Sequence, residues 1–376
     1  MKLNPLLNQA ALEGSSVSGD APMDGRERAL RALRREPVDR TPIYSNFRTP
    51  KAIEQVSGMN FEDDPFAATA AAYRRLPIDM TKEIMVPVTE APPGFRINPT
   101  GYGLMREGPE VETVEEFMGV VNSFPAFEEQ QRDFDFDGEV RALREWFACQ
   151  QGAVGDTTLV TGRMGGCFDP SYDRFGYMTF MTALMDEPGA AEACIRYHAC
   201  ERRLEAEVFV AAGCSEVIWY NDDIAHLGGL LASPDIMRKL WLPHIKWALE
   251  PLFEAGVFVV FHSDGDLRSM LEDIADAGFR ALHPLEPKAN MDPVDLKPEW
   301  GDRFVLIGGL CQVSVLPYGT EQEVRAEVRR LLDGAAPGGG YFIGSTGMCG
   351  PDVPAENAVA WIEEAAGYGE KYGMVL

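Results

Sequence analysis

The sequence has 376 residues, of which 45% are hydrophobic and 25% charged, and its formal net charge is −25. A surface this acidic repels nucleic acid and anionic membranes, so neither is an expected partner. No apolar run reaches the ~18 residues of a membrane span. Seven cysteines without a CxxC pair, and no secretory leader, favour reduced thiols and a cytoplasmic protein.

Taken in chain order, the sequence predicts a flexible tail over residues 1–25 and a single domain over 26–376. Within this domain, segments typical of strands alternate with segments typical of helices. Strands are predicted at 43–47, 84–86, 157–162, 216–220, 257–261, 279–282, 304–307 and 341–343. Helices are predicted at 26–35, 64–76, 140–150, 186–212, 233–255, 267–277, 321–332 and 356–366.

This alternation, with continuous apolar strands, favours a parallel sheet covered by helices, which is the α/β class. About eight strands and no Gly-x-Gly-x-x-Gly turn favour a closed TIM (β/α)8 barrel over an open dinucleotide-binding sheet. In such a barrel the functional groups lie at the carboxyl ends of the strands.

Several predicted strands end in titratable residues. The apolar run VFVVF (257–261) ends at His262, Asp264 and Asp266. A histidine buried at a strand end needs a partner, so His262 is a candidate ligand or acid–base group, whereas Asp266 is expected to cap the next helix. The other residues at strand ends are Asp222, Asp223, His283, Glu286, Cys311 and Cys349.

The His-x-Asp pair of His262 and Asp264 can present a neutral imidazole and a carboxylate to one metal ion. Two ligands do not complete a coordination shell, so a third must come from elsewhere in the chain. Asp222, Glu286 and Cys349 are the candidates.

Three stretches resemble the uroporphyrinogen decarboxylase superfamily. They are ERALRALRREPVDR (27–40), HSDGDLRSMLEDIADAGFRALHPLEPKANMD (262–292) and GGGYFIGSTGMCGPDVPAEN (338–357). The resemblance covers residues 26–370 and implies a TIM barrel. The superfamily contains porphyrin decarboxylases and methyltransferases that work with methylated corrinoids.

The chain departs from both groups at their functional motifs. The porphyrin decarboxylases that this chain resembles carry the motif Arg-Gln-Ala-Gly-Arg-Tyr, whose two arginines pair with substrate carboxylates. In the corresponding stretch, 45–50, this chain has a single arginine, Arg48. An octa-acid substrate needs several cations, so uroporphyrinogen is not the expected substrate. The position of their catalytic aspartate corresponds to Glu83. The thiol-methylating members hold zinc with His-x-Cys and a second Cys; here Asp264 replaces the first Cys, and Cys349 lies two residues after the second position.

The resemblance therefore implies a methyltransferase that moves a methyl group between a small O- or N-methylated donor and a corrinoid (cobalamin) carried by a partner protein. The implied catalytic residues are His262, Asp264, Glu83 and Asp222; the metal ligands, for an expected zinc ion, are His262, Asp264 and Cys349. The expected substrate-binding residues are Arg48, Phe47, Tyr172, Trp219, Asp223 and Glu286.

Two alternatives remain open at this point. The first is a decarboxylase that acts on a smaller substrate, with Arg48 or Arg163 as the cation. The second is a barrel that binds a ligand or a corrinoid protein without catalysis. The resemblance is also compatible with a homodimer.

Overall fold

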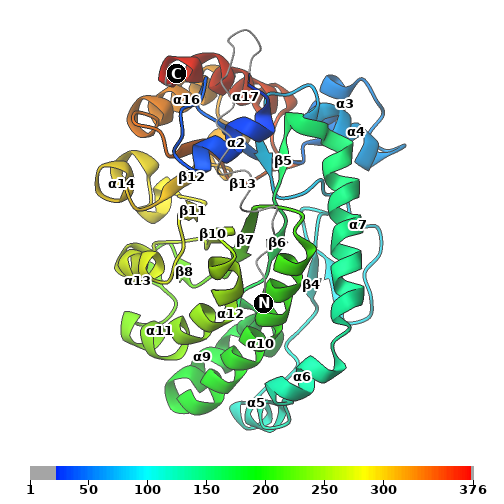
Figure 1. Ribbon diagram of the computed structural model, residues 1–376, viewed down its shortest axis with the longest axis vertical. Coiled ribbons are helices and arrows are strands. Elements are labelled where there is room, and N and C mark those ends of the chain that lie inside the picture. The colour runs from blue at the N-terminus through cyan, green and yellow to red at the C-terminus, as the bar shows by residue number, and fades with distance from the viewer. Residues whose placement is uncertain (1–22, 374–376) are drawn as a thin grey trace.

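The computed structural model of the protein describes residues 23–373 and shows helices arranged around a central sheet (Figure 1). The first helix, α2 (Gly25–Leu33), begins at the N-cap Asp24, whose carboxylate accepts a hydrogen bond from the Glu27 N–H. The predicted tail lies outside the described residues as far as position 22. In residues 23–373 no helix combines the length and the apolar character that crossing a membrane requires.

The central sheet has nine strands, and all neighbouring pairs in it are parallel. Along the sheet, the order is β5-β2-β1-β13-β12-β11-β10-β7-β6. The strands are β1 (Ile43–Phe47), β2 (Met80–Thr81), β5 (Leu159–Val160), β6 (Arg163–Met164), β7 (Val217–Asn221), β10 (Phe258–His262), β11 (Ala281–His283), β12 (Val305–Leu310) and β13 (Tyr341–Cys349). The predicted mixed α/β fold is thus confirmed, as a curled parallel sheet.

The two ends of the strand order are close together in the chain. Only Thr161 and Gly162 separate β5 from β6, and Gly162 has a φ of +72°, a conformation that a strand residue with a side chain rarely adopts. The Gly162 N–H donates to the Lys82 carbonyl (3.0 Å), and the Trp219 N–H donates to the Gly162 carbonyl (3.3 Å). Backbone hydrogen bonds therefore connect both sheet ends through this interruption.

Helices surround the sheet, and small hairpins extend from it. The main helices are α3 (Pro50–Ser57), α4 (Pro65–Tyr73), α7 (Phe136–Val154), α8 (Asp169–Phe175), α9 (Tyr177–Asp186), α10 (Pro188–Ala212), α11 (Pro234–Leu240), α12 (Leu242–Glu254), α13 (Leu271–Asp276), α14 (Pro293–Trp300), α16 (Glu321–Ala335) and α17 (Ala355–Gly369). Shorter elements are α5 (Val114–Val121), α6 (Phe127–Asp133), α15 (Val315–Tyr318), and the hairpins β3–β4 (Phe95–Ile97, Leu104–Arg106) and β8–β9 (Ala225–His226, Gly229–Leu230).

Side chains alternate between two apolar cores, because successive strand residues point to opposite faces. On β7, Ile218 and Tyr220 pack in the larger core with the surrounding helices, while Val217 and Trp219 belong to a second core inside the curled sheet. The second core also contains Tyr44, Met80, Leu159, Val260, Ala281, Val305, Ile307 and Phe342, together with residues of α2.

An ion-pair network fixes the amino-terminal end of the sheet. Asp79, which precedes β2 and is 1% exposed, accepts hydrogen bonds from Arg28 on α2 (2.7 Å) and from Arg40 (2.8 Å). Its carboxylate also accepts from the Ile43 N–H (2.7 Å). With α2 held at this end, the carboxyl ends of the strands are left to form a site.

Two predicted elements are wrong. No strand forms at 84–86, because a side-chain amide and not a strand neighbour satisfies the Ile84 backbone: its N–H donates to Gln150 Oε1 at 2.7 Å. The single helix predicted at 233–255 is two helices that meet at Trp241. In place of the strand predicted at 84–86, the structure has β2, which ends at Thr81, two residues before Glu83.

Candidate functional site

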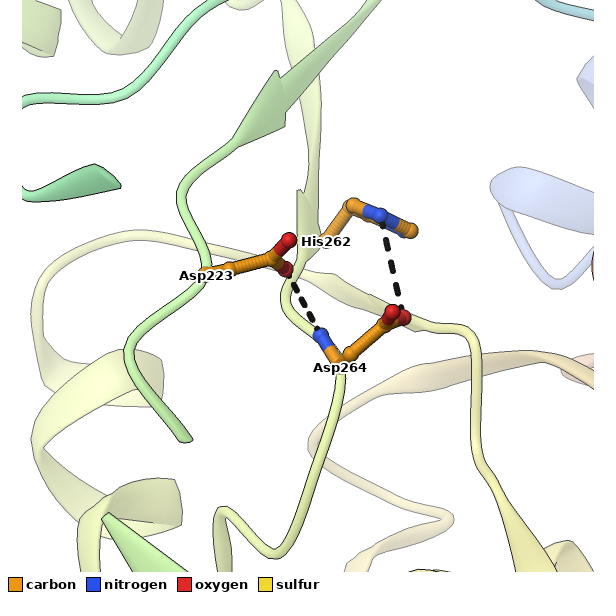
Figure 2. A group of neighbouring side chains, drawn as sticks. All are labelled: Asp223, His262 and Asp264. Carbon is orange, nitrogen blue, oxygen red and sulfur yellow. Dashed lines mark hydrogen bonds and ion pairs between the residues drawn. The ribbon is translucent and has the colours of Figure 1, made fainter. Parts of the chain in front are cut away.

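Three of the expected residues converge where β7 and β10 end (Figure 2). Asp223, His262 and Asp264 each offer a ligand atom, and these atoms all lie within 4.8 Å of one another. His262 Nε2 is 4.0 Å from Asp264 Oδ1, and the Asp264 N–H donates to Asp223 Oδ1 at 2.9 Å. In residues 23–373 this is the one group of at least three such side chains with metal-ligand spacing.

The loop after β10 is built to hold this group in place. Gly265 has a φ of +92°, and a Cβ at this position would overlap the backbone of His226. The Gly265 N–H donates to Glu286 Oε2 (3.0 Å), and Ser263 Oγ accepts from the Ile224 N–H (3.0 Å). The loops after β7, β10 and β11 are therefore tied to each other beside the Asp223–His262–Asp264 group, and Glu286 is placed at its edge.

The carboxylates of the group resist ionisation. Desolvation, followed by the charges of Asp223 and Glu286, raises the pKa of Asp264 to about 7, although 52% of its side chain is exposed. Desolvation also raises the pKa of Asp223. Close carboxylates without a directly bonded cation are stabilised by a divalent ion, and one imidazole nitrogen with two carboxylates is a donor set that zinc accepts. The residues present therefore fit a metal ion.

His262 has a second histidine as its neighbour. The sheet register places His262 opposite His283 on β11, and the two Nδ1 atoms are 2.6 Å apart. Burial holds the pKa of both imidazoles well below their usual value, and the charge of Lys82 acts in the same direction. Both rings are therefore neutral near pH 7, which is the form of histidine that binds metals.

Lys82 contributes a buried amine directly after β2. The side chain is 7% exposed, its Nζ donates to Asn221 Oδ1 (3.0 Å), and Nζ lies 4.5 Å from the centre of the Trp219 ring. Desolvation, followed by the charges of Arg163 and Arg48, lowers the pKa of Lys82 to about 7. An amine with this pKa can both hold and release a proton near neutrality.

Asp222, predicted as catalytic, is not part of the Asp223–His262–Asp264 group. Its carboxylate is fully buried and accepts hydrogen bonds from five donors. These donors are the N–H groups of Cys167, Phe168 and Asp169, the Tyr220 hydroxyl and the Trp241 indole, at 2.7–3.0 Å. Every lone pair that could receive a substrate proton is thus already used in holding the loop after β6.

Cys349, predicted as a metal ligand, lies outside the group of ligand atoms. It is the last residue of β13, is fully buried, and its Sγ contacts Thr49 Oγ1 at 3.5 Å. Burial raises the pKa of this thiol to about 11, so the thiolate that binds zinc is disfavoured. The third residue that lies within ligand distance of His262 and Asp264 is Asp223.

The expected substrate-binding residues are divided between the inside and the outside of the curled sheet. Trp219 lies inside, and its ring stacks on Tyr44 with 4.6 Å between centroids. Arg48 is 8% exposed, and its Nε has no hydrogen-bond partner in the part of the chain that the structure describes. By contrast, Phe47 packs in the outer core.

Two further predicted residues are engaged with neighbours at the edge of the site. Glu83 Oε1 pairs with Arg163 Nε at 2.8 Å. The Tyr172 hydroxyl donates to the Asp223 carbonyl at 3.0 Å and so supports the Asp223 backbone. Tyr172 therefore contacts the Asp223–His262–Asp264 group directly, whereas Glu83 is paired with Arg163.

Sequence reasoning missed the roles of Lys82 and His283. His283 was noted at a strand end but not as the partner of His262, which the register of β10 and β11 alone establishes. Lys82 was missed because the second strand was predicted at 84–86, after this residue, whereas β2 ends directly before it. The signal that was available is the alternation Met80–Lys82, which directs both side chains to the same face.

Polar groups gathered at the carboxyl ends of parallel strands define the active-site arrangement of α/β enzymes. The chain belongs to the uroporphyrinogen decarboxylase (URO-D) family, whose sequence model matches residues 24–368. This confirms the family resemblance found in the sequence.

Similar proteins fall into two groups. The methylcobamide:CoM methyltransferase MtaA of Methanosarcina barkeri strain Fusaro is 25% identical over 357 residues, which cover 90% of this chain and 96% of MtaA. Uroporphyrinogen decarboxylase of Serratia proteamaculans is 23% identical over 368 residues, covering 92% and 98%. A solved methyltransferase from Methanosarcina mazei has a TM-score of 0.65 at 21% identity, covers 92% of this chain and 99% of its own, and shows the same fold.

Proposed function

We propose that this protein is a methyltransferase that transfers a methyl group between a small O- or N-methylated donor and a corrinoid held by a partner protein. The observation that carries the proposal is the convergence of His262 with two carboxylates within 4.8 Å at the strand ends. The similarity to a methylcobamide:CoM methyltransferase along 90% of the chain supports it.

The fold supports this proposal because side chains inside the curled sheet close the bottom of the site. We propose that the curled sheet is a (β/α)8 barrel whose third strand is β5 and β6 together, interrupted at Thr161 and Gly162. The barrel interior then ends at Lys82, His262 and His283, above the rings of Tyr44 and Trp219. A donor would enter from the carboxyl ends of the strands, where TIM barrels hold their substrates.

Asp223, His262 and Asp264 would hold a divalent ion, with zinc as the first expectation. When bound, such an ion would supply Lewis-acid polarisation of the donor oxygen or nitrogen. Oxygen ligands in place of thiolates suit a harder leaving atom than sulfur. This is why we expect an ether, alcohol or amine donor and not a thioether.

A residue of the chain would supply the proton that the leaving oxygen or nitrogen needs. When the bond between the methyl carbon and its oxygen or nitrogen breaks, the electron pair stays on that atom, which must be protonated to leave well. Lys82 Nζ is the proton donor in this proposal, because its charge already acts on His262 and Asp264 and its pKa is about 7. Arg48, buried without an acidic partner among the described residues, would bind an anionic group of the donor.

The test measures metal content and methyl transfer in the same preparations. Elemental analysis of the purified protein is expected to find a stoichiometric divalent ion that His262→Ala loses and His244→Ala keeps, since His244 pairs with Glu192 elsewhere (3.2 Å). Incubation with cob(I)alamin and a panel of methoxylated and N-methylated compounds is expected to give the methylcobalamin spectrum. No spectral change with any donor would refute methyl transfer.

A second candidate is a decarboxylase that acts on a small carboxylate. The observation in its favour is Arg48, a buried guanidinium that forms no ion pair with a described residue and so suits a carboxylate substrate. The similarity to uroporphyrinogen decarboxylases agrees with it. Release of CO2 from a carboxylate panel by metal-free protein, without methyl transfer, would establish this function instead.

A further inference from the structure

The imidazole of His262 has two ring nitrogens with different surroundings. Nε2 is 4.0 Å from Asp264 Oδ1, on the side of the carboxylates. Nδ1 is 2.6 Å from Nδ1 of His283, and the two rings stack with centroids 4.8 Å apart and 27° between their planes. Each nitrogen of His262 therefore has one neighbour, and only one of the two can be the metal-binding atom.

We infer that His283 is a positioning residue, which accepts a hydrogen bond from His262 Nδ1–H and so keeps the Nε2 lone pair of His262 directed at the metal. The inference rests on the proposed metal site at Asp223, His262 and Asp264. It assigns His283 no contact with the substrate.

The geometry requires that one Nδ1 donates and the other accepts. At 2.6 Å two lone pairs would repel, and two N–H groups would clash, so a single proton lies between the rings. A histidine that binds a metal through Nε2 carries its proton on Nδ1. His283 Nδ1 must then be the acceptor, which places the proton of His283 on its own Nε2.

The surroundings of His283 prevent it from turning away. It is 1% exposed, and its ring contacts Tyr44 and Trp219 edge-on at 5.0 and 4.8 Å. Its strand pairs with β10 in direct register with His262. Among residues 23–373, His283 Nδ1 forms the hydrogen bond with His262, and His283 Nε2 has no partner in hydrogen-bond geometry.

The test compares two substitutions at position 283 by metal affinity. His283→Phe keeps a ring for packing but removes the acceptor, whereas His283→Gln retains an acceptor oxygen. Loss of such a partner weakens metal binding by about 10- to 100-fold. We therefore expect that loss of Zn²⁺ affinity, by chelator competition, in His283→Phe, a smaller loss in His283→Gln, and none in His244→Gln. Urea unfolding of each apoprotein separates folding defects from lost affinity.

A second measurement uses the unaltered protein. The chain has five histidines, so ¹⁵N-histidine spectra of the Zn²⁺-loaded protein can be assigned with single variants. We expect His262 protonated at Nδ1 and His283 protonated at Nε2. A proton on His283 Nδ1, or equal Zn²⁺ affinity in wild type and His283→Phe, would overturn the role of His283 while leaving the metal site intact. A wild-type protein that binds no metal would overturn the proposed function and this inference together.

Discussion

The clearest quantitative test of the site concerns Lys82, because its burial has an energetic cost that depends on pH. The pKa of this amine falls from 10.5 to about 7 in the folded protein. Between these values the unfolded chain binds more protons than the folded chain, so the free energy of unfolding must rise with pH. The destabilisation caused by burying this amine is therefore largest below pH 7 and has disappeared above about pH 10.5.

For Lys82→Met this reasoning gives a magnitude. A pKa shift from 10.5 to about 7 lowers the free energy of unfolding by roughly 5 kcal/mol at low pH. Roughly 1–2 kcal/mol of this loss is regained when the pH rises from 7 to 8.5. Methionine keeps the apolar stem and removes the charge. We expect the variant to be more stable than wild type near pH 7, and the difference to shrink as the pH rises.

The assay is urea unfolding of metal-free protein at both pH values, with Lys51→Met as the control, since Lys51 is exposed on α3. Methyl transfer by the Lys82 variant should fall sharply if the amine is the proton donor. Parallel pH dependence in wild type and Lys82→Met would refute the depressed pKa, and with it the argument for Lys82 as an acid near neutrality.

Three further outcomes follow from the contacts around the site. Asp222→Asn should lower the free energy of unfolding, measured with urea, by about 3–5 kcal/mol, because an amide cannot accept from all five buried donors. Unchanged stability with lost activity would instead make Asp222 a catalyst. Gly166→Ala should unfold at lower urea, since its Cβ would overlap the Asp222 carboxyl group, whereas Gly189→Ala has open space and should not. Cys349→Ala should keep the Zn²⁺ affinity of wild type, and a tenfold loss would restore the thiol as a ligand.

The sequence predicted the site where strand length and alternation were both clear. The strand before His262 was placed within one residue, so the imidazole and Asp264 were expected on the correct loop. Asp222 and Asp223 were both named, but adjacent residues after a strand point to opposite sides. Only the register and the helices around β7 show that Asp222 faces the Trp241 indole while Asp223 faces His262.

The prediction failed where a strand was very short or unusually long. β2 has two residues, too few for an apolar pattern to mark, and so Lys82 was passed over for Glu83. β13 runs to Cys349, six residues beyond the predicted end at 343, which carries the thiol past the apolar run and into contact with Thr49. A ligand inferred from its distance to a strand end is thus only as reliable as the end itself.

The charges at the carboxyl ends of the strands explain why a metal and a lysine can share one site. Asp223, Asp264 and Glu286 place three carboxylates beside a single buried ammonium, and each of the two aspartates has a raised pKa. A divalent ion would add two positive charges, lower both carboxyl pKa values and repel the Lys82 proton. Asp223, His262 and Asp264 would hold the ion, and Lys82 would become a stronger acid toward the oxygen or nitrogen from which the methyl group leaves.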